Sequence, residues 1–352
     1  MDFYRLNCNI FLDYYFIISL LLVFFLAGSL LGSRLRIKIN MPNFKIGKIA
    51  TFVFGLVFFS AIVFFIFQSD ADFFSGYESY NTDFLGKAAT FLVIGCFLTI
   101  YFLEIGIGII SIFPILASLL LCVVIMLGLG ARIYFLLFVI SFLMYSIKYR
   151  NLKISIKYIA LIALIFLIFL IIGVLRVGLD LNFENLMYIL FAEPMFTWWS
   201  AQTYILNNDL FSLIGDPAGY VTSFYNFIPS FIFENKSNYI INISDYANFS
   251  SPLGATSLIV SLLGNFGIVL SMIYIFVVGF FCSQLSIFSE KSSFLKVYYI
   301  LICSLLPFQF FRDGFEILNK QIYWNMLIVP SILLLIICGL SLILKYPIAS
   351  RK

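Results

Sequence analysis

Three arginines stand at the ends of apolar segments in a chain that has few charged residues. They are Arg132 in "GLGARIYFL", Arg176 in "GVLRVGLD" and Arg312 in "FQFFRDGFEIL". A guanidinium keeps its charge at every physiological pH, and its planar fork of N–H donors matches two phosphate oxygens. Three such groups at one membrane depth would form a binding site for a diphosphate. An anchor at the level of the lipid headgroups explains each arginine equally well when it is taken alone.

Carboxylates offer a second kind of chemistry. Glu193 is a lone carboxylate in the apolar, aromatic segment "FAEPMFTWW". A carboxylate in such surroundings either pairs with an arginine or resists ionisation, and in both cases it is suited to take a proton from a hydroxyl group. A capped or paired acid with a structural role fits the same segment. Asp313, next to Arg312, and Asp245, in a polar stretch, are the reserve candidates.

The sequence lacks the residues that other common kinds of active site require. The chain contains no histidine, which excludes imidazole bases, histidine metal ligands and histidine proton relays. Its six cysteines are not at metal-ligand spacing, and five of them lie in apolar runs where a thiol behaves as a small hydrophobe. No glycine-rich nucleotide-binding loop is visible in the sequence. We therefore expect neither a metal nor a cofactor.

The composition identifies the fold class. Hydrophobic residues make up 63% of the 352 residues and charged residues only 11%, whereas soluble domains have about 25% charged residues. Apolar runs recur along the whole chain, and a helix needs about 20 such residues to cross a bilayer. The sequence predicts an all-α polytopic membrane protein with about 10–12 transmembrane helices. We expect these helices to form a single integral membrane domain over residues 1–352.

The predicted spans follow the apolar runs. The segment 186–206 is less certain, because it carries Glu193 and Pro194, and it either spans, re-enters or lies at the interface. The same three alternatives apply to the segment 219–233, which would pair with 186–206 as a hairpin. The other spans are predicted near 14–33, 48–67, 87–103, 107–127, 131–147, 158–175, 266–285, 297–311 and 321–344.

The position of Arg132 follows from the length of its apolar run. Residues 105–147 are too long for one span and suited to two, with a turn at "GLGAR" where two glycines relax the backbone. A guanidinium in the middle of a bilayer would be costly. The turn therefore places Arg132 at a membrane surface.

The basic residues predict the orientation. Of the 21 lysines and arginines, 14 fall on one set of loops, which the positive-inside rule assigns to the cytoplasm. The outer side then holds a large loop region near 176–253, rich in Asn, Ser, Tyr, Phe and Trp. This mixture suits stacking on sugar faces and hydrogen bonding to hydroxyl groups, although an aromatic belt at the interface has the same composition. No span has an ionisable group near its middle, which argues against an ion-coupled transporter.

Several motifs occur together in a recognisable order. They are Gly-x-Arg at 130–132, the turn at Arg176, "AEP" at 192–194, "NFIPSFIFENKS" at 226–237, "GATSLIVSLLGNFGIVLSMIYIFVVG" at 254–279 and "FRDGFEIL" at 311–318. In this order the chain resembles the O-antigen polymerases of the Wzy type, over roughly residues 120–320. The resemblance implies a glycosyltransferase of the Gram-negative inner membrane with a GT-C-like arrangement of helices, and an active site that faces the periplasm.

The resemblance also implies a reaction. Such an enzyme joins oligosaccharide repeat units carried on undecaprenyl diphosphate, by transferring the growing chain to the next lipid-linked unit without a metal or a nucleotide. Arg132, Arg176 and Arg312 are then expected on the diphosphate, and Glu193 is the leading base, with Asp245 and Asp313 as further substrate contacts. The expected partners are the lipid-linked oligosaccharides, membrane lipids and a separate chain-length regulator, and no nucleic acid.

Two rival functions use the same kind of molecule. An O-antigen ligase shares the architecture, but ligases of that type are associated with a periplasmic histidine beside an arginine, and this chain has no histidine. A flippase for lipid-linked oligosaccharides is a transporter and not an enzyme. It must pass a hydrated glycan through the bundle, whereas the predicted spans lack ionisable groups near their middles. Both comparisons favour the polymerase.

Overall fold

The computed structural model describes residues 8–35, 37, 44, 46–68, 82–128, 132–151, 155–208, 212–228 and 232–345. Within these ranges the protein is helical with irregular connections and contains no strand, which confirms the predicted all-α class. Six of the described helices are long and apolar enough to cross a membrane, and four further apolar helices are shorter. The protein is thus a helical membrane protein, and the expected total of 10–12 spans stays a prediction.

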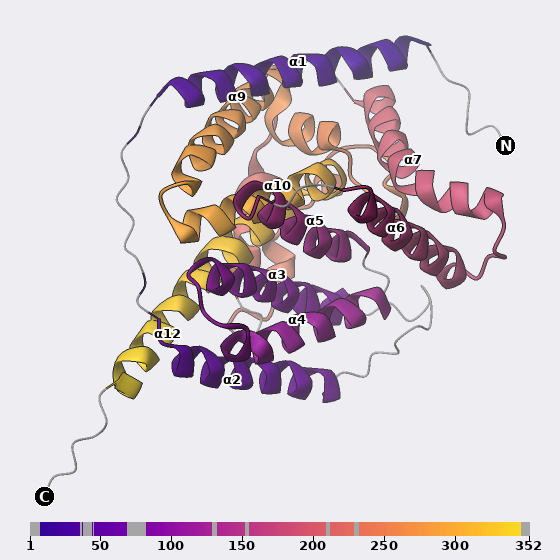
Figure 1. Cartoon of the computed structure of the whole chain (residues 1–352). Helices are drawn as coiled ribbons and strands as arrows, with labels where there is room; N and C mark the ends of the chain where they lie inside the picture. The colour runs from indigo at the N-terminus through magenta and orange to yellow at the C-terminus, as the bar shows by residue number, and fades with distance from the viewer. Residues whose placement is uncertain are drawn as a thin grey trace, which may run out of the picture. The chain divides into compact units, whose positions relative to one another are not determined.

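Most predicted spans correspond to a single observed helix (Figure 1). The helix bounds are α1 Cys8–Arg34, α2 Lys48–Phe67, α3 Thr82–Glu104, α4 Ile109–Gly128, α5 Arg132–Tyr149, α6 Ile156–Arg176, α7 Phe183–Asn207, α8 Ala218–Thr222, α9 Leu258–Ser289, α10 Ser293–Arg312, α11 Phe315–Asn319 and α12 Val329–Lys345. A π-helix at Lys320–Ile328 joins α11 to α12. Four short 3₁₀-helices are η1 Ser223–Phe227, η2 Lys236–Tyr239, η3 Ile243–Asp245 and η4 Pro252–Gly254.

Two predicted boundaries differ from the structure. Helix α9 begins at Leu258, before the predicted start near 266, because the Ser257 hydroxyl accepts a hydrogen bond from the Ile259 amide at 3.3 Å and caps an earlier first turn; a break at Gly267 separates this part from the predicted span. The predicted span at 321–344 begins at Phe315, since the apolar face of α11 is already buried there.

The two open segments have different outcomes. Helix α7 contains the whole of 186–206 and continues through Pro194. The described part of 219–233 consists of α8 and η1, which have five residues each, so this segment is not one spanning helix.

The chain divides into two compact units. The first comprises residues 1–39, 191–290 and 305–322, and the second comprises residues 40–190, 291–304 and 323–352. The single domain predicted over residues 1–352 stays a prediction.

In the first unit, α1 packs along α9 at very short range (Figure 1). Gly28 and Gly32 lie four residues apart on α1, and a Cβ atom at Gly28 would collide with the carbonyl group of Phe276 on α9. Gly279 on α9 makes the reciprocal approach to α1. Small residues at this spacing allow two membrane helices to approach until their backbones touch. The buried Gln284 side chain then donates to the backbone carbonyls of Gly32 and Leu35 at the end of α1.

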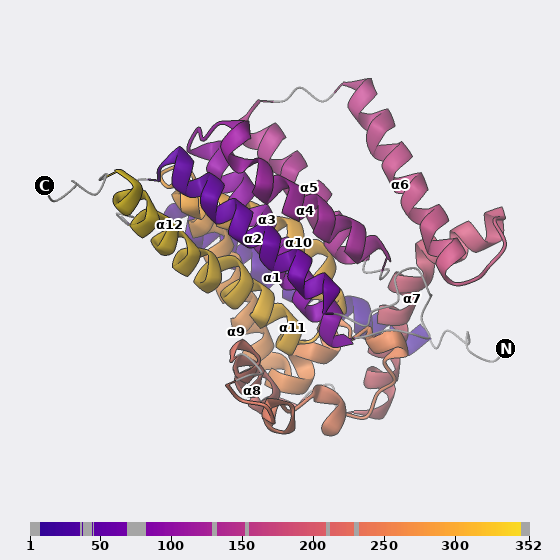
Figure 2. The ribbon, with the colours of Figure 1, turned by 90° about the horizontal axis from the view of Figure 1, so that it is seen from below.

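In the second unit, α2, α3, α4 and α5 lie side by side (Figures 1 and 2). Helix α3 is the most enclosed of them, and Leu92, Phe97 and Ile100 on it have no exposed surface. Helix α12 packs on α2, where the Gly47 amide donates to the Ser341 hydroxyl at 2.9 Å. Helix α3 therefore forms the core of this unit, with the other helices around it.

Candidate functional site

The candidate site in the first unit is built on a break in α9. Gly267 has φ +66° and ψ −176°, a conformation that is essentially restricted to glycine. The next amide, that of Ile268, donates to the carbonyl of Ser212 at 3.0 Å instead of to a residue of its own helix. Gly215 approaches the Gly267 backbone so closely that a side chain at either position would collide with the other segment. The break therefore docks the start of the loop region against α9.

Four aromatic rings join the elements around this break. Tyr220 of α8 packs on Phe266 of α9 and on Phe315 of α11, with ring centroids 5.1 and 5.0 Å apart. Tyr274 completes the group and stacks on Phe266 at 5.1 Å. Each such pair contributes about 0.5–1.5 kcal/mol beyond the area that it buries. We call Tyr220, Phe266, Tyr274 and Phe315 the four-ring cluster, and it fixes the start of α11 against α8 and α9.

Arg312 and Asp313 lie immediately before this start. Arg312 is the last residue of α10, and its guanidinium is 3.5 Å from the carboxylate of Asp313. The Asp313 side chain is only 7% exposed, whereas that of Arg312 is 28% exposed. Burying a carboxylate is costly unless a cation or a donor accompanies it, and Arg312 supplies the cation. The structure thus pairs two of the predicted site residues with each other and leaves a guanidinium that solvent still reaches.

Glu316 is a carboxylate of this site that the sequence analysis did not select. It lies in the first turn of α11, and its carboxylate folds back over Gly314, where any Cβ atom would collide with it. The carboxylates of Asp313 and Glu316 are close enough to repel each other. The signal in the sequence is "RDGFE", in which an acid follows the helix break at the position where a new first turn favours one.

Two side-chain hydrogen bonds attach the loop region to α11. The Asn226 amide donates to the backbone carbonyl of Glu316 at 3.0 Å. The Asn319 amide donates to the Ser223 hydroxyl at 2.8 Å, and both of these side chains are buried. Buried polar groups need such partners, so these contacts define one position of η1 on α11. Residues of the predicted outer loop therefore contact α11, the helix that follows Arg312 and Asp313.

A tyrosine extends the site on the α9 side. The Tyr246 hydroxyl donates to the Asn265 side-chain oxygen at 3.0 Å. Desolvation raises the pKa of Tyr246, and the nearby carboxylates of Asp216, Glu316 and Asp245 raise it further. Its phenol is therefore held in the neutral form, as a hydrogen-bond donor.

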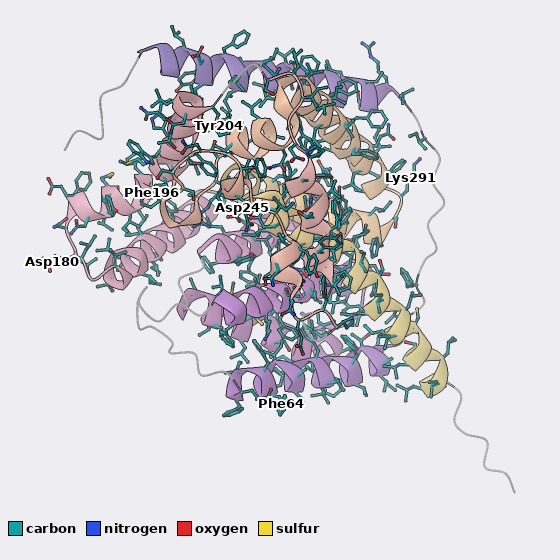
Figure 3. All side chains as sticks on the ribbon, turned by 180° about the vertical axis from the view of Figure 1, so that it is seen from behind. Phe64, Asp180, Phe196, Tyr204, Asp245 and Lys291 are labelled. Atoms are coloured by element: carbon teal, nitrogen blue, oxygen red, sulfur yellow. The ribbon has the colours of Figure 1, made fainter. Side chains whose placement is uncertain are left out.

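Asp245, one of the predicted substrate contacts and labelled in Figure 3, is an exposed residue of this loop region. Its carboxylate accepts the Asn242 amide at 2.8 Å and forms a capping box with it at η3. Asp245 thus has a local structural role in capping η3. Its negative charge also disfavours ionisation of the neighbouring Tyr246 hydroxyl.

The other two predicted arginines belong to the second unit. Helix α4 ends at Gly128, α5 begins at Arg132, and Arg176 is the last residue of α6. The predicted turn between α4 and α5 includes residues 129–131, which lie outside the described part of the structure. Phe135 and Leu136 near the start of α5 pack against a buried cluster that includes Leu170 and Val174 in the last part of α6. The backbones of Arg132 and Arg176 therefore lie at the same end of neighbouring helices. Their side chains are outside the described part of the structure, and the three-arginine site stays a prediction.

Glu193, the leading base of the sequence analysis, lies on α7 in the turn that precedes Pro194. Only its backbone is among the described positions, so its expected role as a base also stays a prediction.

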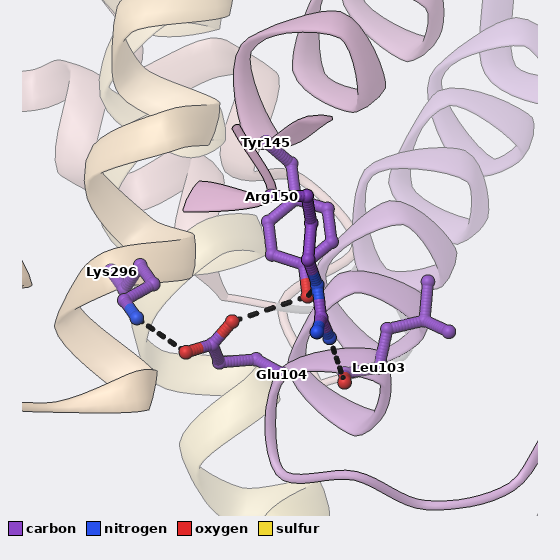
Figure 4. A network of polar contacts seen from close by, with 5 residues as sticks. All are labelled: Leu103, Glu104, Tyr145, Arg150 and Lys296. Atoms are coloured by element: carbon purple, nitrogen blue, oxygen red, sulfur yellow. Dashed lines mark hydrogen bonds and ion pairs between the residues drawn. The ribbon is translucent and has the colours of Figure 1, made fainter. Parts of the chain in front are cut away.

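A second polar group connects three helix ends in the second unit (Figure 4). Glu104, at the end of α3, forms an ion pair with Lys296 in the first turn of α10. The Tyr145 hydroxyl donates to Glu104 at 3.1 Å, and Arg150 donates to the Tyr145 oxygen at 2.9 Å and to the Leu103 carbonyl at 2.7 Å. The distribution of basic residues predicts all these helix ends on the cytoplasmic side, and the structure brings them together within the second unit.

The candidate site in the first unit thus combines the partly exposed Arg312 guanidinium, the carboxylates of Asp313 and Glu316, and the neutral phenol of Tyr246 near the aromatic rings. Such a set can bind an anionic ligand that also carries hydroxyl groups, and can accept a proton from one of them. Comparison with protein-family models, with curated proteins and with solved structures found no match for the chain.

Proposed function

We propose that the protein polymerises O-antigen repeat units that are linked to undecaprenyl diphosphate, as a glycosyltransferase with a GT-C-like arrangement of helices. It would act at the periplasmic face of the inner membrane of a Gram-negative bacterium. The observation that carries this proposal is the segment from Arg312 to Glu316, which holds a partly exposed guanidinium and two carboxylates and is attached to the aromatic loop region through the Glu316 backbone.

The chemistry of the transfer asks for these groups. The bond between the anomeric carbon and the diphosphate oxygen of the donor breaks, and the carbon forms a bond with a hydroxyl oxygen of the acceptor. The diphosphate leaves with additional negative charge, which Arg312 would neutralise as it develops, together with Arg132 and Arg176. A carboxylate would take the proton that the acceptor hydroxyl loses.

The candidates for this base are Glu193, from the sequence, and Glu316, from the structure. Asp313 would act as a positioning residue, because its carboxylate already faces the Arg312 guanidinium. Asp245 would lie at the edge of the glycan site. The substrates would be the lipid-linked oligosaccharides, and a chain-length regulator would be the partner that sets the product length.

Deletion of the gene tests this function against its two rivals. Loss of a polymerase should leave lipopolysaccharide whose core carries a single repeat unit, because synthesis, flipping and ligation of that unit continue. Bare core together with long polymer on undecaprenyl diphosphate would instead identify a ligase. Bare core with single units trapped on the cytoplasmic leaflet would identify a flippase. The absence of histidine in this chain favours the polymerase over the ligase.

A further inference from the structure

Three aromatic rings of the loop region stand apart from the four-ring cluster. Tyr239, at the end of η2, lies between Phe233 and Tyr225, with ring centroids 5.2 and 6.5 Å away. Tyr239 is 55% exposed and Tyr225 is 43% exposed. We call Tyr225, Phe233 and Tyr239 the aromatic shelf. Unlike the rings of the cluster, two of these rings present much of their surface to the outside.

The aromatic shelf is held in place by polar contacts. The Lys236 ammonium donates to the Ile228 carbonyl at 2.6 Å and so ties η2 to the end of η1. The Asn226 amide, in the residue next to Tyr225, donates to the Glu316 backbone at 3.0 Å. These bonds attach the segments that carry the rings to η1 and, through the neighbour of Tyr225, to α11. A surface ordered in advance loses less entropy when it binds a ligand.

The residues between the rings are polar. The stretch "ENKSN" at 234–238 separates Phe233 from Tyr239, and Glu234, Asn235 and Asn238 are exposed. Amide and carboxylate side chains bond well to hydroxyl groups, while tyrosine rings supply rigid amphipathic area at a low entropy cost. A pyranose ring has the complementary surface, with an apolar C–H face and hydroxyl groups around its edge.

We infer that the aromatic shelf is a sugar-binding subsite, on which a pyranose of the lipid-linked oligosaccharide stacks while its diphosphate lies toward Arg312. This inference rests on the proposed function and identifies the part of the protein that recognises the glycan. The other reading of exposed tyrosines is an aromatic belt at the membrane interface. The sugar reading accounts for the exposed amide and carboxylate groups of 234–238 as partners for hydroxyl groups, and the experiment below separates it from the belt.

Steady-state polymerisation separates the two readings. The full chain is reconstituted in nanodiscs and supplied with lipid-linked repeat units extracted from the deletion strain. We expect Tyr239→Ala to raise KM about tenfold with little change in kcat, since about 1.4 kcal/mol of binding corresponds to a factor of ten. Tyr239→Phe keeps the ring and should stay within about twofold of wild type. Tyr188→Ala is the matched control, since Tyr188 on α7 is 48% exposed.

An unchanged KM in an active Tyr239→Ala variant would overturn the shelf and leave the polymerase proposal standing. An equal rise of KM in Tyr188→Ala would also overturn the shelf, because loss of an exposed tyrosine from an aromatic belt should have the same effect at Tyr188 as at Tyr239. A second measurement needs no catalysis: saturation-transfer NMR with the free oligosaccharide released from the single-unit lipopolysaccharide. Contact with the sugar that is lost in Tyr239→Ala supports the shelf even if polymerisation fails, and no contact in the wild type overturns it.

Discussion

At the scale of single residues, the role of Arg312 can be tested with a substitution that keeps the positive charge and removes the planar guanidinium. If Arg312 were only an anchor at the lipid headgroups, it would need just a long side chain and a positive charge, and lysine would substitute for it without loss of function. A diphosphate clamp uses two parallel donors, which lysine lacks. Losing one such contact in the transition state costs about 2–4 kcal/mol, or roughly thirty- to a thousandfold in rate. We expect Arg312→Lys to abolish long-chain O antigen on gels of lipopolysaccharide while the protein level on immunoblots stays normal.

The structure selects the control for this experiment. Arg150 is unsuitable, because its guanidinium bonds to Tyr145 and to the Leu103 carbonyl. Arg34 is exposed in the last turn of α1, and Arg34→Lys should be silent. Wild-type ladders from Arg312→Lys would show that Arg312 is an anchor.

The role of Glu316 can be tested by substitutions at Glu316 itself and at Gly314, over which its carboxylate lies. Replacing Gly314 by alanine places a methyl group where the Glu316 carboxylate lies, and the end of this flexible side chain can move without unfolding the helix. We expect Glu316→Gln to lower the polymerisation rate about a hundredfold, as loss of a general base does. Gly314→Ala should lower it as well, and the double variant should be no slower than Glu316→Gln alone.

The parallel variant Glu193→Gln decides between the two candidate bases. If it abolishes the rate while Glu316→Gln remains active, then Glu193 is the base and Glu316 has a structural role. Rates are to be compared at equal amounts of purified protein.

At the scale of elements, the break in α9 should depend on one glycine. A side chain at Gly267 is strained by its positive φ and would also collide with the Ser212 carbonyl. We expect Gly267→Ala to lower the stability by about 1–3 kcal/mol. Gly339→Ala in α12 is the control, because a Cβ atom there meets nothing within 4 Å. The thermal midpoint in detergent should fall for the first variant and stay level for the second.

The sequence predicts the elements better than it predicts the site. Hydropathy locates the spans, because each needs about 20 apolar residues whatever its neighbours are. It misses the break at Gly267, since an apolar run contains no sign that the Ser212 carbonyl will receive the Ile268 amide. It also misses Glu316, whose importance depends on the four-ring cluster that fixes α11. The sequence points to Arg312 and Asp313 separately, and the ion pair between them is seen only in the structure.

The polar group at Glu104 is also a property of elements, since it joins the ends of α3, α5 and α10. The Glu104 and Lys296 side chains are 16% and 17% exposed, so the pair is only weakly screened by solvent. We expect Lys296→Ala to cost about 1–2 kcal/mol, more than an exposed pair and less than a fully buried one. Lys291→Ala, at an exposed position next to α10, is the control. The free energy of unfolding in a mild detergent would measure both, and equal values would show that the pair contributes nothing.

At the scale of the whole molecule, the remaining question is which ends of the helices face outward. Fourteen of the 21 basic residues lie on the side predicted as cytoplasmic, and the ends of α3 and α5 and the start of α10 meet there within the second unit. The proposed site requires that the loop region lies on the other side of the membrane, in the periplasm, because the lipid-linked units would be joined there.

Cysteine labelling in whole cells tests this orientation at two exposed positions. In a cysteine-free background, Lys291→Cys should resist a membrane-impermeant thiol reagent until the cells are opened. Asp216→Cys, in the loop that docks on the α9 break, should react in intact cells once the outer membrane is permeabilised. Both sites are exposed, so a difference in labelling reports the side of the membrane and not burial. Reaction of Lys291→Cys in intact cells would reverse the topology and would move the Arg312 site, the aromatic shelf and the proposed polymerisation away from the periplasm.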